Sequence, residues 1–323
     1  MEDGKSREVL LDVKNLCMHF SVKSRRKKTI VKAVDDVSFQ VYRSETFGLV
    51  GESGCGKTTT GRTILRLYNP TSGTITFGGK EISGRMTSEL RKYLTENITC
   101  IFQDPIESLN PRMTVREIIG EGLSVRGIKD PKEIDDRVYE VLEKVGLTRE
   151  HANRYPHEFS GGQRQRIGIA RAIIVNPAMV IADEPVSALD VSVQAQVINL
   201  LNELKQEYGL TIIFVAHNLS VVKYFSDRIG VMYRGKLVEV ANSDDLYEHP
   251  LHPYTKSLLS AIPMPNPLVE KDREVIGYDA ATAHDYSVEK PSMVEILPEH
   301  FVYASESEAR RYREELKGVT ECL

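Results

Sequence analysis

The residues of this sequence with the clearest capacity for chemistry form one short glycine-rich run. In order they are Gly51, Glu52, Ser53, Gly54, Cys55, Gly56, Lys57 and Thr58, with Thr59 directly after them. Glycines let the backbone curl so that several N–H groups point at one anion. The Lys57 ammonium can neutralise phosphate oxygens, and the Thr58 hydroxyl can ligate Mg²⁺. A plain glycine-rich turn that caps a helix is the alternative, and the Lys-Thr pair weighs against it.

Two adjacent carboxylates, Asp183 and Glu184, end an apolar run at 179–182. In an open α/β sheet, ligands bind at the carboxyl ends of the strands. There Asp183 can hold Mg²⁺ through water, and Glu184 can act as a general base toward a water molecule. Taken alone, the pair fits a helix N-cap through Asp183 better. After a phosphate loop, it is the expected second half of a nucleotide site.

A second glycine pair stands before a helical pattern at 163–174. The run reads Phe159, Ser160, Gly161, Gly162 and Gln163. A helix that begins here presents free N–H groups and a positive dipole end to an anion. An ordinary N-cap by Ser160 is the simpler interpretation of five residues in isolation.

Two further polar residues, Gln103 and His217, each follow an apolar segment. A lone His after a buried strand is more often a hydrogen-bonded core residue than a ligand, and Gln103 could be a polar residue at a strand end. We expect the end of the segment before His217 to face the same site as Glu184, which favours a phosphate contact for His217.

The elements that must position these residues alternate between strands and helices. Short apolar strands are expected at 46–50, 179–183 and 211–216, and helices at 57–68 and 187–208. This order predicts a parallel sheet covered on both sides. Before it, 7–50 is β-rich, with a basic run at 24–28 that fits a solvated hairpin tip better than a nucleic-acid patch. Residues 104–175 have helical spacing and predict a helical insert.

Composition limits the function classes. The chain has 323 residues, 41% hydrophobic and 27% charged, so a disordered or disulfide-rich chain is excluded. With 42 basic and 46 acidic side chains the net charge is −4, which argues against a nucleic-acid binder. The four scattered cysteines argue against a zinc or iron–sulfur site. No apolar run approaches the length of a signal peptide or membrane span, so we expect a cytosolic chain that meets a membrane only through partners.

The last 83 residues differ in composition, with seven of the 14 prolines. They predict an irregular appendage that ends in a helix at about 305–317. Ser305 and Glu308 can form a capping box at its start, and Gly318 can end it.

Together these pieces resemble the ATP-binding cassette (ABC) ATPases, in the order of that family. The resemblance covers about 9–240 and implies an α/β fold. This is an ABC-type P-loop NTPase core with an N-terminal antiparallel β subdomain, a helical insert subdomain and an irregular C-terminal extension. The matched pieces are the Walker A loop at 51–58, the Q-loop Gln103, the signature at 159–163, Walker B at 179–184, the D-loop Asp190 and the H-loop His217.

The resemblance implies ATP and Mg²⁺ as ligands. It implies that Thr58, Gln103 and Asp183 hold Mg²⁺, that Glu184 is the catalytic base, and that Phe20 stacks on adenine, although Phe20 could equally be a core residue. It also implies that two cassettes pair head to tail, so that the signature Ser160, Gly161, Gly162 and Gln163 acts on nucleotide held by the other cassette.

A finer resemblance is to importer ATPases of the dipeptide, oligopeptide and nickel type. The segment at 246–259 is similar to the region after the cassette in that group, and the tail at 285–302 is similar to ATPase subunits of Gram-positive oligopeptide permeases. We therefore expect an ABC ATPase domain at 7–240 and an extension at 241–323. Many relatives hold an iron–sulfur cluster in a Cys-rich C-terminal segment. Here the only cysteine after residue 100 is Cys322, so no cluster is expected.

This resemblance implies a peripheral subunit at the cytoplasmic face of the cell membrane that hydrolyses ATP to drive oligopeptide import. The implied partners are a second, homologous ATPase subunit, two transmembrane permease subunits and, indirectly, an extracellular peptide-binding lipoprotein. Nucleic acid is not an expected partner. Import of dipeptides, nickel or another small solute is the alternative. A soluble ABC ATPase or a small-molecule kinase fits less well.

Overall fold

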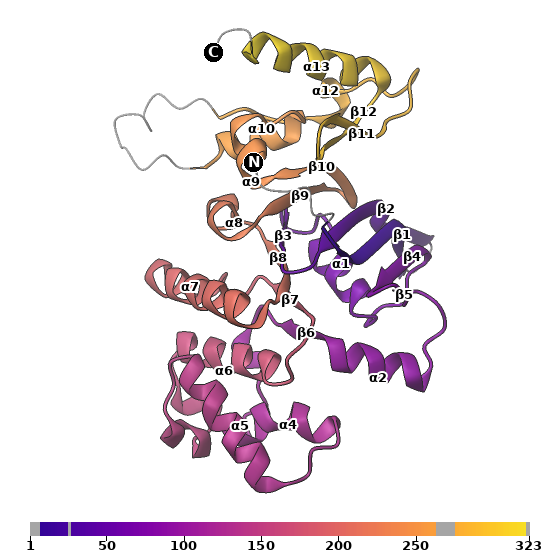
Figure 1. Ribbon diagram of the computed structural model, residues 1–323. Helices are drawn as coiled ribbons and strands as arrows, with labels where there is room; N and C mark the ends of the chain where they lie inside the picture. The colour runs from indigo at the N-terminus through magenta and orange to yellow at the C-terminus, as the bar shows by residue number, and fades with distance from the viewer. Residues whose placement is uncertain (1–6, 25–26, 263–274, 321–323) are drawn as a thin grey trace.

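The computed structural model describes residues 7–24, 27–262 and 275–320. In Figure 1 the chain forms a stack. Helices α4 (Val115–Val125), α5 (Pro131–Lys144) and α6 (Gly161–Ile173) lie at one end, and α13 (Glu306–Thr320) lies at the other. The β-sheets occupy the middle. No helix among the described residues is both long enough and apolar enough to cross a bilayer.

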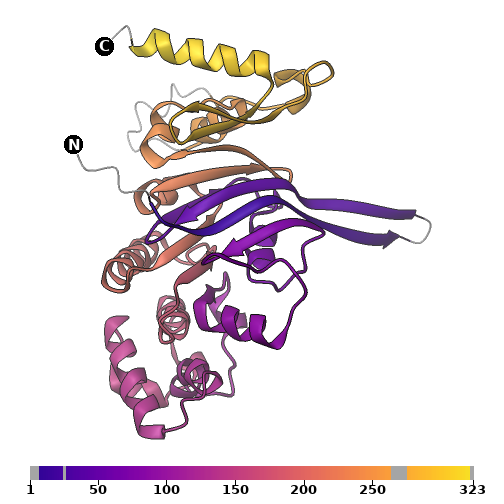
Figure 2. The ribbon, with the colours of Figure 1, turned by 45° about the vertical axis from the view of Figure 1, so that its right-hand side comes forward.

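The N-terminal part is an antiparallel sheet, as predicted. Its strands are β1 (Val9–Ser24), β2 (Lys27–Tyr42), β4 (Ser72–Phe77) and β5 (Lys80–Glu81), in the order β2-β1-β4-β5. The inward side chains of β1, such as Leu11 and Val13, are buried. The far ends of β1 and β2 project beyond the rest of the molecule as a long hairpin (Figure 2).

The second sheet has eight strands in the order β11-β12-β10-β9-β3-β8-β7-β6. The five strands β9, β3, β8, β7 and β6 are parallel to one another, and β10 and β12 continue the sheet in antiparallel pairing. The bounds are β3 (Thr46–Val50), β6 (Ile98–Ile101), β7 (Met179–Asp183), β8 (Thr211–Ala216), β9 (Arg228–Tyr233), β10 (Lys236–Asn242), β11 (Ser292–Leu297) and β12 (His300–Ala304). Every residue of β3, β7 and β8 is buried, as expected for strands covered on both faces.

Helices cover this sheet, and two of them are shorter than predicted. They are α1 (Lys57–Ile64), α2 (Ser88–Asn97), α7 (Val191–Tyr208), α8 (Leu219–Phe225) and α9 (Ser243–Glu248). Helix α1 was expected to reach residue 68, but Arg66 adopts a positive φ of 59° that a helix cannot continue through. Helix α7 starts at Val191 and not at 187, because 184–189 forms tight turns in which Ser187 N–H donates to Glu184 O and Leu189 N–H to Val186 O.

The helical part follows β6 and returns to β7. It contains α3 (Pro105–Ser108), α4, α5, α6 and two 3₁₀ turns, η1 (Arg149–Asn153) and η2 (Pro156–Glu158). The apolar face of α5 is buried through Val138, Val141 and Leu142, and these residues share one core with Ile119 of α4 and Ile169 of α6. This core ties the helical part to the central sheet.

The C-terminal part is more regular than the composition indicated. It holds α10 (Pro253–Ser260), α12 (Ala280–Ala283), the β11–β12 hairpin and α13. Strand β12 adds to the central sheet by pairing with β10, with Glu239 opposite Val302. The capping box is present: Glu308 N–H donates to Ser305 Oγ, and Ser305 N–H donates to the Glu308 carboxylate. The predicted end at Gly318 is wrong, since α13 runs on to Thr320.

Candidate nucleotide-binding site

The glycine-rich run lies between the end of β3 and the start of α1, where the predicted phosphate loop requires it. Gly51 has a φ of +146° and Gly56 a φ of +112°. A Cβ atom on Gly51 would lie 2.2 Å from the Met232 carbonyl oxygen, and one on Gly56 would lie 2.2 Å from the Ala33 carbonyl oxygen. Both positions therefore exclude a side chain, and neighbouring backbone holds the loop closely.

Lys57 occupies the inside of this loop. Its Nζ donates to the carbonyl oxygens of Gly51 at 2.7 Å and Glu52 at 2.9 Å, and the residue is only 4% exposed. The third ammonium donor faces the Cys55 sulfur at 3.8 Å, a weak acceptor that a phosphate oxygen could replace.

Thr58 and Asp183 face one another across the start of α1. Thr58 Oγ1 donates to Asp183 Oδ1 at 2.7 Å, and an Arg62 guanidinium nitrogen lies 3.8 Å from the other carboxylate oxygen. Burial raises the pKa of Asp183 above its ordinary value, while the Thr58 hydrogen bond and the Arg62 charge act in the opposite direction. A bound divalent cation would favour the ionised carboxylate strongly. Arg62 was not singled out from the sequence; its place one helical turn after Thr58 is the signal that could have found it.

Two side chains converge on one carboxylate oxygen of Glu184. Glu184 Oε2 accepts a hydrogen bond from Gln103 Nε2 at 3.2 Å and lies 3.1 Å from His217 Nδ1. These residues follow the ends of β6, β7 and β8, which are parallel neighbours in the sheet. Glu184 has a positive φ of 48°, and its N–H is bound to Val215 O, which fixes the backbone there. The structure thus brings the predicted base, the Q-loop glutamine and the H-loop histidine together.

A cavity of about 430 Å³ opens over these groups. It is lined by Ala33, Ser53, Gly54, Gly56, Lys57, Thr58, Thr59, Gln103, Glu184 and His217. Backbone N–H groups at the start of α1 and the Lys57 ammonium suit a polyphosphate. The Thr58 hydroxyl, the Asp183 carboxylate and the Gln103 amide oxygen are the hard oxygen ligands that Mg²⁺ prefers. The donor set fits a nucleoside triphosphate with its metal ion.

The signature residues do not join this cavity in their own chain. Ser160 is exposed and caps α6, accepting from Gln163 N–H at 3.3 Å, while the Gln163 side-chain oxygen accepts from Ser160 N–H. Gly162 packs so closely on Val193 that a Cβ would lie 2.6 Å from that side chain. Asp190 is exposed at the start of α7, with no side-chain capping bond. None of these residues lines the cavity.

Phe20 also lies outside the lining of the cavity. It is half-buried on β1 and meets Tyr68 edge-on, with ring centroids 5.4 Å apart. Its predicted contact with adenine stays a prediction.

One other group of possible metal ligands occurs among the described residues. The ligating atoms of Cys17, His19 and Asp35 all lie within 4.8 Å of one another. However, the two Asp35 oxygens are each 3.2 Å from an ammonium group, one from Lys32 and one from Lys236. These two cations already satisfy the carboxylate and would repel a metal ion, so this group is a poor metal site.

Comparison with known proteins agrees with the site. The sequence pattern of the family described as "ABC transporter" matches residues 34–187, and that of "Oligopeptide/dipeptide transporter, C-terminal region" matches 238–287. The chain is 56% identical to an oligopeptide transport ATP-binding protein, OppF, of Bacillus subtilis, over 94% of this chain and 99% of that protein. It is 53% identical to a dipeptide transport ATP-binding protein, DppF, of Lactococcus lactis, over 94% and 96%.

Solved structures show the same fold. The ATP-binding cassette MJ0796, in a dimeric post-hydrolysis state bound to ADP and Pi, superimposes with a TM-score of 0.66 at 29% identity, over 72% of this chain and 99% of that one. The cassette CbiO1 of Clostridium perfringens gives a TM-score of 0.65 at 27% identity, over 75% and 91%. The chain belongs to the ABC transporter ATPase family, in the group that carries the oligopeptide/dipeptide transporter C-terminal region.

Proposed function

We propose that the chain is the ATP-hydrolysing subunit of an importer for oligopeptides. One observation carries this proposal. The same chain has the cavity lined by Lys57, Thr58 and Glu184, with Asp183 bound to Thr58, and the transporter-type C-terminal region. The names of the relatives, oligopeptide and dipeptide transport ATP-binding proteins, supply the solute class.

In this proposal Phe20, Asp183 and the residues that line the cavity divide the work on ATP and Mg²⁺. The loop at 51–59 and Lys57 hold the phosphates, and Phe20 stacks on adenine. Thr58, Gln103 and Asp183 hold Mg²⁺, which when bound neutralises charge on the phosphate oxygens.

Glu184 accepts a proton from the attacking water as the bond from the γ-phosphorus to its bridging oxygen breaks. ADP leaves with that oxygen. Gln103 and His217 hold the Glu184 carboxylate in place through the contacts at 3.2 and 3.1 Å, and His217 also contacts the γ-phosphate.

The exposed signature at 160–163 acts in trans. It stands at the free N-terminus of α6 and outside the cavity of its own chain, which leaves it available to cap phosphate held by another cassette. Asp190, at the start of α7, follows Leu189, which packs near Gly161 of the signature, and joins that interface. ATP would then draw two cassettes together, and loss of phosphate would release them, which is a ligand-driven two-state switch.

The proposed assembly pairs this chain with a second, homologous ATPase subunit beneath two transmembrane permease subunits. An extracellular peptide-binding lipoprotein delivers the solute. The chain sits peripherally at the cytoplasmic face of the cell membrane, with residues 7–240 as the ATPase domain and 241–323 as the extension. Dipeptides are the second candidate solute, and the 53% identity to a dipeptide transport protein favours them.

Co-purification from native membranes tests this assignment. The tagged full-length chain is solubilised gently, and the proteins that travel with it are identified. We expect two multi-span proteins, a second cassette ATPase and a peptide-binding lipoprotein. Ribosomes or nucleic acid in a fraction without membrane subunits would overturn the transport assignment and leave the ATPase chemistry intact.

A further inference from the structure

A tyrosine of the C-terminal part reaches the phosphate loop. The backbone N–H of Glu52, the second residue of the loop, donates to the Tyr254 hydroxyl at 3.1 Å. Tyr254 stands at the start of α10, about two hundred residues further along the chain. Lys57 holds the same loop segment, because its Nζ donates to the carbonyl oxygens of Gly51 and Glu52.

The Tyr254 ring is held rigidly. The residue is 1% exposed, and its ring centroid lies 4.5 Å from that of Tyr233 and 5.3 Å from that of Tyr278. Tyr233 ends β9, which pairs directly with β3, the strand that leads into the loop. Packing therefore fixes the position of the Tyr254 ring, and the hydroxyl that accepts from Glu52 N–H is not free to rotate away.

A buried carboxylate fixes the backbone that carries Tyr254. Glu239 on β10 is fully buried and accepts hydrogen bonds from Leu251 N–H at 2.8 Å and His252 N–H at 3.0 Å. His252 then caps α10, since its Nδ1 accepts from Tyr254 N–H at 3.1 Å. The position of α10 is thus tied to the same sheet that carries the phosphate loop.

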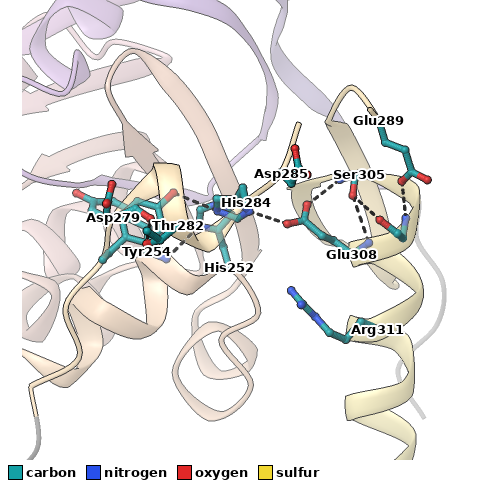
Figure 3. A network of polar contacts seen from close by, with 12 residues as sticks. His252, Tyr254, Asp279, Thr282, His284, Asp285, Glu289, Ser305, Glu308 and Arg311 are labelled. Atoms are coloured by element: carbon teal, nitrogen blue, oxygen red, sulfur yellow. Dashed lines mark hydrogen bonds and ion pairs between the residues drawn. The ribbon is translucent and has the colours of Figure 1, made fainter. Parts of the chain in front are cut away.

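These polar contacts behind Tyr254 continue to the start of the last helix, α13. His284 lies 3.1 Å from the Tyr278 hydroxyl through Nε2 and 2.7 Å from a Glu308 oxygen through Nδ1. Figure 3 shows His284 pointing toward Glu308, with Ser305 on the other side of that carboxylate. Glu308 belongs to the capping box of α13, so the last helix also supports the cluster behind Tyr254.

We propose that Tyr254 is a positioning residue for the phosphate loop, and that the extension thereby sets the affinity of its own chain for ATP. This inference rests on the proposed ATPase function. The Tyr254 hydroxyl fixes the peptide between Gly51 and Glu52, and that peptide shapes the cradle that receives the phosphates. Without this bond the loop must be ordered when the nucleotide binds, and the cost appears as weaker binding.

Tyr254→Phe tests the inference, because it deletes the hydroxyl and keeps the ring. Tyr278→Phe is the matched control, because it removes a hydroxyl that bonds His284 and not the loop, and it keeps the ring that packs on Tyr254. Binding of a non-hydrolysable ATP analogue to the full-length chain is measured by fluorescence titration. We expect the Kd of Tyr254→Phe to rise about three- to tenfold, the range for one lost hydrogen bond. The control should stay within about twofold of the original chain.

Hydrogen–deuterium exchange supplies a readout that general loosening would not reproduce. In nucleotide-free Tyr254→Phe, peptides that cover 50–56 should exchange faster, and in Tyr278→Phe they should not. An unchanged Kd in Tyr254→Phe, or equal weakening in both variants, overturns the inference. If the original chain itself binds no ATP analogue, the proposed function fails first and this inference fails with it.

Discussion

The substitution Glu184→Gln gives the sharpest test of the site. Glutamine has the same shape as glutamate and keeps one side-chain oxygen that can accept from Gln103 and His217. The side chain is only 15% exposed, so the cavity around it should hold the amide in the place of the carboxylate. What the amide cannot do is take a proton from water.

The size of the effect follows from that difference. General base catalysis contributes about a hundredfold to ten-thousandfold, so turnover should fall by at least about a hundredfold, or about 2.7 kcal/mol in the barrier. ATP binding should change by less than about twofold, because Glu184 makes no hydrogen bond to the phosphate loop. With binding kept and turnover lost, ATP should accumulate in closed cassette dimers.

Phosphate release by the assembled complex measures turnover, and light scattering with and without ATP measures dimer closure. Glu203→Gln is the matched control, since it makes the same chemical change at an exposed position on α7. Turnover of Glu184→Gln within about tenfold of the original chain, with ATP binding intact, would remove Glu184 from the role of base.

Four further substitutions test other parts of the structure. Ser160→Ala and Thr114→Ala each remove the N-cap of a helix in the insert and should each cost about 1 kcal/mol of stability by thermal unfolding. Only Ser160→Ala should also lower ATP turnover, by about tenfold or more, while ATP binding stays intact. Burial raises the pKa of Asp183, so its ionisation weakens the nucleotide-free fold as pH rises through the folded-state pKa. Asp183→Asn should therefore raise the unfolding midpoint at about neutral pH, lose that gain as the pH falls below the ordinary carboxyl pKa of 3.8, and abolish Mg²⁺-dependent ATP binding. Glu239→Ala should lower the free energy of unfolding in urea by about 3 kcal/mol or more, because it leaves the buried amides of Leu251 and His252 without an acceptor.

Much of the nucleotide site could be predicted because its chemistry follows from short runs and from strand order. The loop at 51–58 is contiguous, so its geometry depends mainly on local backbone. Gln103, Glu184 and His217 are far apart in sequence, yet each follows a strand of one parallel sheet. Neighbouring parallel strands end at the same edge, so the strands expected before Glu184 and His217 already placed those two residues together, whereas Gln103 was assigned to the site only through the family resemblance.

The C-terminal part shows what the sequence did not reveal. Its proline content predicted an irregular appendage, but β11 and β12 form a hairpin that extends the central sheet. Pairing of β12 with β10 depends on contacts across about sixty residues, which no local pattern encodes. The contact between Tyr254 and Glu52 joins residues that are even further apart in the sequence. The segment that holds Tyr254 was recognised only through the family resemblance.

Ser160 and Tyr254 represent two different ways of controlling the same nucleotide site. Ser160 lies outside the cavity of its chain, so in the proposed function it acts on ATP only when a second cassette comes close. Tyr254 touches the loop inside one chain, so its influence precedes any pairing. The two residues belong to different elements and share no contact among the described hydrogen bonds, and effects at such independent sites add. Under the two proposals, the extension tunes how tightly one cassette holds ATP, and the signature governs what two cassettes do with it.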